Sequence, residues 1–98
     1  IPQEMRFYWN YPNPFNPETV VRYQISGIEQ KYNVSLKVYN LIGQEIASLV
    51  DKEQQPGYYE VRFNGRSLST GVYFYRLIID GNTNASRFTD VKKMMLLK

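Results

Sequence analysis

Side chains able to do chemistry are scarce in this chain of 98 residues. It has no cysteine and no histidine, so it lacks a thiolate nucleophile and the usual general base near neutral pH. Oxygen ligands come close together at Asp51 and Glu53, and at Asp80, Asn82 and Asn84, but without the full loop pattern of a calcium site. We expect solvated turns there, and therefore no catalytic residue, no metal site, no cofactor and no enzymatic activity.

Net charge and hydropathy exclude two further classes of function. The chain has a formal net charge of +3, and because residues 1–91 contain nine charges of each sign, the excess lies on Lys92, Lys93 and Lys98. A nucleic-acid-binding surface needs a wider basic face. The longest apolar runs, residues 72–75 and 94–97, are far shorter than the roughly 18 residues of a membrane-spanning helix. We expect neither nucleic acid nor a membrane span.

The elements that must position any functional residue are strands. Apolar and polar residues alternate in segment after segment, as half-buried strands require. The clearest runs place three apolar residues each on one face: Val21, Tyr23 and Ile25; Val34, Leu36 and Val38; Tyr59, Val61 and Phe63. Further strands are expected at residues 46–50, 72–79 and 88–97, and an entry strand at 5–9. The 72–79 segment is apolar on both faces, which favours a central position.

Turn signals separate these runs. Pro56-Gly57, Asn64-Gly65 and Asp80-Gly81 are residue pairs typical of tight turns. Strand centres twelve to fourteen residues apart indicate an all-β fold, a single small antiparallel sandwich. Residues 41–49 have roughly helical spacing, but Gly43 interrupts them, so a turn between two strands is favoured over a helix.

The opening motif, residues 10–17, has three prolines within six positions. It consists of Asn10, Tyr11, Pro12, Asn13, Pro14, Phe15, Asn16 and Pro17. Proline fixes φ and removes a donor, which predicts a stiff, non-helical entry segment. We expect Tyr11 and Phe15 to cover one end of the sandwich while the asparagines bond to nearby backbone. The alternative is a proline-rich ligand for a small adaptor domain.

The second motif, residues 69–77, leads from small polar residues into a strand dense with aromatics. Aromatic faces can stack on sugars or bases, so a carbohydrate or oligonucleotide platform must be weighed. Alternation, however, divides the set: Tyr73, Tyr75, Leu77 and Ile79 share one face, and Val72, Phe74, Arg76 and Ile78 the other. Since neither face is a clean aromatic row, core packing is favoured.

The third motif, residues 92–98, leaves two interpretations equally open. It is either an edge strand whose lysines prevent edge-to-edge pairing, or a docking surface open to strand addition. If Met95 and Leu97 pack inward, the apolar residues that alternate with them are left on an outer face between lysines. The candidate residues for partner recognition are then Lys92, Lys93, Met94, Leu96 and Lys98.

Together these motifs resemble the C-terminal sorting domain, type A, of cargo proteins of the type IX secretion system in Bacteroidetes and related bacteria. The resemblance covers essentially the whole chain and includes the opening motif. Its central positions are Gly57, Tyr59, Gly71, Tyr73 and Tyr75. Lys92, Leu96 and Lys98 fall on the terminal pattern of lysine, three residues, leucine, one residue, lysine.

The resemblance implies an immunoglobulin-like sandwich of about seven strands, with residues 1–17 as entry strand and proline-rich segment and 18–98 as the remainder. It implies an address label on a larger cargo that is exported through the periplasm and secreted or attached to the cell surface. Translocon proteins and a sortase-like peptidase are the implied partners, and we expect a monomer. Two alternatives stay open: a structural module like that of flagellar hook-capping proteins, or a carbohydrate-binding module of a secreted enzyme.

Overall fold

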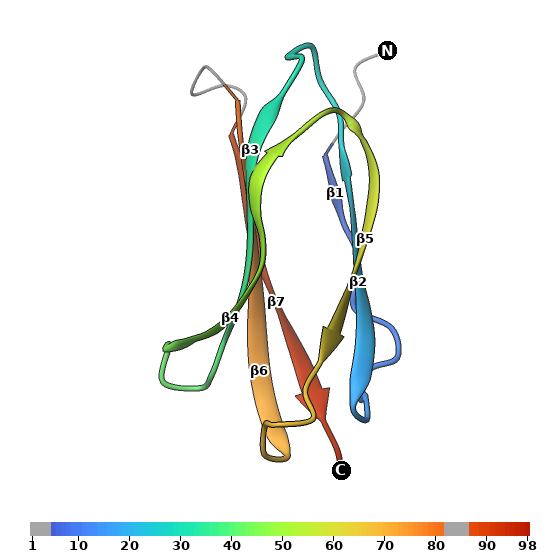
Figure 1. Ribbon diagram of the computed structural model, residues 1–98, viewed down its shortest axis with the longest axis vertical. Coiled ribbons are helices and arrows are strands. Elements are labelled where there is room, and N and C mark those ends of the chain that lie inside the picture. The colour runs from blue at the N-terminus through green and yellow to red at the C-terminus, as the bar shows by residue number, and fades with distance from the viewer. Residues whose placement is uncertain (1–4, 82–86) are drawn as a thin grey trace.

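A computed structural model describes residues 5–81 and 87–98. The described residues form seven strands in two antiparallel sheets, which lie face to face in Figure 1. The strands are β1 (Arg6–Phe7), β2 (Glu18–Ile25), β3 (Tyr32–Tyr39), β4 (Glu45–Gln54), β5 (Gly57–Asn64), β6 (Gly71–Asp80) and β7 (Phe88–Leu96). One sheet has the order β1-β2-β5 and the other the order β4-β3-β6-β7. The expected all-β, immunoglobulin-like sandwich is confirmed.

The core lies between the sheets and uses the faces that alternation predicted. In β2, Val21, Tyr23 and Ile25 are all buried, and in β3 the same holds for Val34, Leu36 and Val38. From β5, Phe63 is buried and Tyr59 and Val61 pack against the cluster. Removing these apolar faces from water is the main driving force for the fold.

Strand β6 is one of the two inner strands of the four-stranded sheet. It pairs with β3 on one side and with β7 on the other, over nearly its full length. Its four inward residues, Tyr73, Tyr75, Leu77 and Ile79, are buried in the core. The predictions of a central strand and of core packing for these tyrosines are therefore confirmed.

The segment with helical spacing is a turn followed by a strand, as expected. Asn40 Oδ1 accepts hydrogen bonds from the backbone N–H groups of Ile42 and Gln44, at 3.1 and 2.9 Å. Gly43 has a φ of 85°, a conformation that favours glycine. Strand β4 then begins at Glu45, so these side-chain bonds replace the first turn of a helix.

The entry strand is shorter than its sequence suggested. Strand β1 covers only Arg6–Phe7, which pair with Gln24 and Tyr23 of β2. Pairing with β2 is interrupted at Asn10, whose backbone N–H donates to the Tyr75 hydroxyl, and it resumes at a single bridge between Tyr11 and Val20. Within the described residues, no helix has the length and hydropathy needed to cross a membrane.

Candidate functional site

The opening motif lies along the outer edge of the terminal strand. The backbone N–H of Phe15 donates to Met95 O at 2.9 Å, and Leu97 N–H donates to Phe15 O at 3.0 Å. The Met95 N–H donates to Asn13 Oδ1 at 3.1 Å. Phe15 and Leu96, the last residue of β7, thus form an isolated parallel bridge. The two ends of the sequence are joined, and the last part of the β7 edge is already paired.

Buried side chains pack together where the opening motif meets β7. Phe15 and Leu96 are both buried, and the Phe15 ring lies 6.1 Å from the Phe63 ring, centroid to centroid. Gly65 lies against them, and its N–H donates to Pro17 O at 2.7 Å. The expected role of Phe15 as a cover of the sandwich end is confirmed. The same expectation for Tyr11 is wrong: its side chain is 73% exposed, since the backbone of Tyr11 pairs with Val20 and turns the ring outward.

Two glycines provide a test of this junction. A Cβ at Gly65 would lie 3.2 Å from Leu96 Cδ2 and 3.3 Å from Phe15 Cε2, whereas a Cβ at Gly71 would meet nothing within 4 Å. We expect Gly65→Ala to lower the free energy of unfolding by about 1–3 kcal/mol through overpacking. Gly71→Ala should leave it unchanged or raise it by up to about 1 kcal/mol. Urea unfolding of both variants checks this, and equal stabilities would contradict the described packing.

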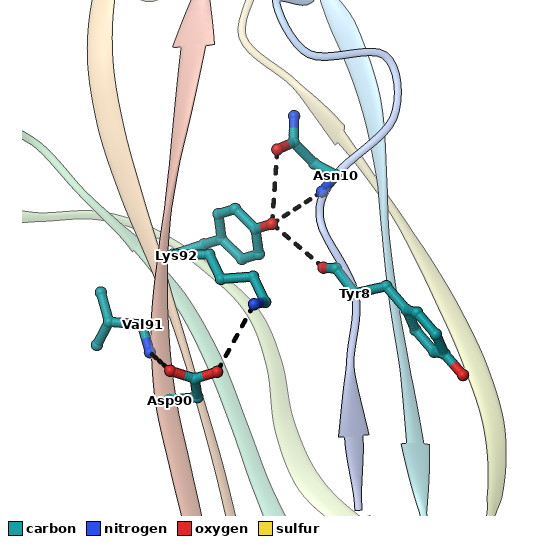
Figure 2. A network of polar contacts seen from close by, with 6 residues as sticks. Tyr8, Asn10, Asp90, Val91 and Lys92 are labelled. Carbon is teal, nitrogen blue, oxygen red and sulfur yellow. Dashed lines mark hydrogen bonds and ion pairs between the residues drawn. The ribbon is translucent and has the colours of Figure 1, made fainter.

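Asn10 organises the start of the opening motif. Its side-chain Nδ2 donates to Pro12 O at 3.1 Å and to Thr19 Oγ1 at 3.0 Å, and Thr19 Oγ1 donates to Pro12 O at 2.9 Å. Its backbone N–H donates to the Tyr75 hydroxyl at 2.8 Å, and that hydroxyl donates to Tyr8 O at 3.2 Å (Figure 2). The expected local bonding by asparagine is confirmed at this position, and it extends to the other sheet.

Tyr75 connects the opening motif to the central strand. It is fully buried, and the Phe7 ring meets it edge-on at a centroid distance of 5.2 Å. Burial raises the pKa of Tyr75 to about 12; the hydrogen bond from the Asn10 backbone lowers it and the charge of Asp90 raises it further. The neutral hydroxyl is therefore the form that the fold stabilises.

The Lys92 side chain of β7 lies against the aromatic rings of the entry segment. Its Nζ lies 4.5 Å from the Trp9 ring centroid and 5.5 Å from the Phe7 ring centroid. The same Nζ lies 3.8 Å from Asp90 Oδ2 (Figure 2). Only 15% of its side chain is exposed. These cation–π contacts attach the terminal strand to the entry strand. Alternation could not predict them, because it says nothing about pairs in different sheets.

The docking interpretation of the terminal motif needs a correction. Met94 and Leu96 are buried at 1% and 0% exposure, and it is Met95 and Leu97 that face solvent. The physical reason is the register with β6, which places Met94 opposite the inward-facing Tyr73. Met94 and Leu96 therefore belong to the core and cannot form the outer surface that the docking interpretation assigned to them.

Both terminal lysines other than Lys92 are exposed, but only one is tied to the fold. The Lys98 N–H donates to Thr70 Oγ1 at 3.1 Å, and its Nζ donates to Arg66 O. Lys93 lies on the outward face of β7, opposite Phe74. Of the five recognition candidates, Lys93 is thus the one that presents its side chain outward from the sheet.

The remaining motif positions are structural. The Tyr59 ring stacks on Tyr23 at 5.4 Å, and its hydroxyl donates to Gln55 O at 2.6 Å, beside the turn that ends at Gly57. The Tyr73 hydroxyl donates to Ser69 O at 2.6 Å and so fixes the start of β6.

Among the described residues, no three acidic side chains come together in a way that could hold a metal ion. Asn82 and Asn84 lie outside the described residues. A hollow of about 620 Å³ on the three-stranded sheet is lined by Tyr11, Val20, Arg22, Glu60, Val61 and Arg62. The two arginines and the glutamate that line it lie on the neighbouring strands β2 and β5 and carry opposite charges.

Comparison with known proteins identifies the family to which the chain belongs. A family model described as the secretion system C-terminal sorting domain matches residues 10–92. The chain belongs to this family. The match begins at Asn10 and ends at Lys92, and the resemblance seen in the sequence is confirmed. Comparison with curated protein sequences gives no match.

A solved structure confirms the fold of this sorting domain. The chain is similar to the crystal structure of dimeric latent PorU from Porphyromonas gingivalis, with a TM-score of 0.69 and 18% sequence identity. The alignment covers 95% of this chain and 9% of that chain, so the sorting domain corresponds to a small part of the larger protein.

Proposed function

We propose that this sorting domain directs a larger cargo protein from the periplasm across the outer membrane, and that components of the type IX translocon recognise it. The observation that carries the proposal is the family match over residues 10–92. We further propose that residues 1–98 act as one non-catalytic unit, and that a sortase-like peptidase removes it when the cargo is attached to the cell surface.

The contacts of the terminal motif support a specific form of this proposal. Leu96 is buried, Lys92 lies between aromatic rings, and Lys98 bonds to the loop before β6. These three residues act by completing the sandwich, and the signal is the folded domain. Under this proposal, residues 92–98 are not recognised as a separate, unfolded peptide.

Export of a fluorescent reporter tests the proposal. The reporter carries a periplasmic targeting signal and residues 1–98 at its C-terminus, and is expressed in a bacterium with an active type IX system and in a strain lacking that system. We expect release or surface display only in the first strain, and periplasmic retention of a reporter without the domain. Retention of both reporters in both strains would contradict the proposal.

Truncation is a poor way to locate the signal in this domain. A chain ending at residue 91 loses Met94 and Leu96 from the core together with the edge that pairs with Phe15. Such a chain would lose export by unfolding, whatever the translocon recognises. Point substitutions at exposed positions are required.

A further inference from the structure

The outer face of the four-stranded sheet carries an apolar surface at the end near the C-terminus. We call this surface the sheet-face patch. It comprises Tyr39 of β3, Val72, Phe74 and Arg76 of β6, and Lys93 and Met95 of β7. The register makes them neighbours: Phe74 lies opposite Tyr39 on one side and Lys93 on the other, and Val72 lies opposite Met95. All six side chains alternate with residues that face the core.

The apolar part of the sheet-face patch continues beyond the strands. Met95 is 39% exposed, and Leu97 follows it on the same face at 47%. Beside Val72 a hollow of about 280 Å³ is lined in part by Leu41 and Ile42, whose side chains are largely exposed. Val72 and Phe74 are half-buried beside these exposed residues. An apolar surface of this kind is typical of a site of protein association.

The charged residues of the sheet-face patch are basic, and the guanidinium of one of them, Arg76, is held in a fixed orientation. The Arg76 guanidinium lies 5.0 Å from the Tyr39 ring centroid, and its Nη2 donates to the Tyr39 hydroxyl at 2.7 Å. A guanidinium fixed in this way matches the geometry of a carboxylate. Glu45, the acidic residue paired with Tyr39 in the register, forms an ion pair with Lys37 at 3.2 Å. The charges of Arg76 and Lys93 therefore face outward without an acidic partner on the patch.

Strand addition at β7 is a weaker route for a partner. Asn13 and Phe15 occupy the edge at Met95 and Leu97. Backbone groups of alternate residues point to the same edge, so the next outward N–H groups belong to Lys93 and Val91. The Val91 N–H already donates to Asp90 Oδ1 at 2.8 Å. The face of the sheet is more accessible than its edge.

We propose that the sheet-face patch is the surface by which the sorting domain docks on a protein of the secretion apparatus, and that this partner presents apolar side chains bordered by carboxylates. This inference rests on the proposed function. A protein is favoured over an anionic membrane because the two basic residues of the patch, Arg76 and Lys93, are fewer than the clusters of roughly four to eight that bind acidic lipids. The fixed Arg76 also suits a carboxylate in a defined position.

A charge reversal tests the patch. The double variant Arg76→Glu/Lys93→Glu is compared with Lys31→Glu/Arg62→Glu, which makes the same charge change at exposed residues elsewhere. In the reporter fusion we expect export of the first variant to fall about tenfold or more, while both purified domains keep melting temperatures within a few degrees of the parent. Parental export of the patch variant would overturn the inference. Failure of the parent fusion to be exported would instead contradict the proposed function.

Photo-crosslinking tests the chemistry of the partner. p-Benzoylphenylalanine replaces Phe74 in the exporting strain, with replacement of the exposed Tyr58 of β5 as control. We expect crosslinks specific to the Phe74 position, mapped by mass spectrometry to a protein segment that has Asp or Glu beside apolar residues. Crosslinks to a second copy of the domain, or to a segment without carboxylates, would contradict the proposal. So would binding of the purified domain to phosphatidylglycerol vesicles that the charge reversal abolishes, without a protein crosslink.

Discussion

Replacing Leu96 by alanine is expected to lower the free energy of unfolding by about 2–5 kcal/mol. The Leu96 side chain is fully buried, and it lies at the junction of the terminal strand with Phe15 and Gly65. Removal of three carbons leaves a cavity that the stiff proline-rich segment cannot easily fill. Because small domains have total stabilities of about 5–15 kcal/mol, this single change removes a large share.

Leu97→Ala is the matched control for this prediction. Leu97 is the next residue, is 47% exposed, and contributes its backbone N–H rather than its side chain to the junction. Its replacement should change stability by no more than about 0.5 kcal/mol. Urea titrations followed by circular dichroism measure both variants. Similar losses for the two would show that the inward and outward faces of β7 are assigned wrongly.

The domain is expected to lose stability steeply between pH 10 and pH 12. Burial raises the pKa of Tyr23 to about 12, while a hydrogen bond to Gln54 lowers it and the nearby Tyr59 raises it; the pKa of Tyr75 is also about 12. Both folded-state values lie above the unfolded value of 10.0. The unfolded chain therefore loses these protons first, so the stabilisation is complete below pH 10 and is lost as pH rises toward 12.

Tyr75→Phe separates this titration from general alkaline damage. The variant should be less stable at pH 7 by about 1–3 kcal/mol, because the Asn10 N–H and Tyr8 O lose their buried partner. Its further loss between pH 10 and pH 12 should be clearly smaller than that of the parent, since one of the two tyrosines with a raised pKa is gone. Thermal melts across this pH range make the comparison. An identical pH dependence in parent and variant would contradict the role given to Tyr75.

The periodicity of apolar residues predicted the features of the fold that depend on the local sequence of a single strand or turn. Alternation identified the inward faces of β2, β3 and β5, because successive side chains of a strand point to opposite faces of the sheet. Residues 72–79 are apolar on both faces, so alternation predicted a central strand there without showing which face of β6 is buried. The turn at Asn40 to Gln44 was also predictable, since Gly43 interrupts the helical pattern. Motif order and spacing were enough to indicate the family that the comparison shows.

Periodicity could not predict the contacts of the entry segment and the opening motif with the terminal strand. Residues 13–15 pair with β7, and Lys92 lies between rings of the entry segment, but pairing between distant segments leaves no local signal. For the same reason, the sequence did not show which face of β7 points to the core. Met94 and Met95 are equally apolar, and only the register with β6 decides that Met94 faces the core.

The central claim is that the sorting signal is the folded sandwich, completed by its terminal strand, rather than the terminal peptide alone. The most direct measurement compares export of three reporters by a type IX-secreting bacterium: one fused to residues 1–98, one fused only to residues 88–98, and one without either. We predict export of the first reporter alone. Export of the 88–98 fusion at the level of the whole domain would contradict the claim and would make the terminal peptide the signal.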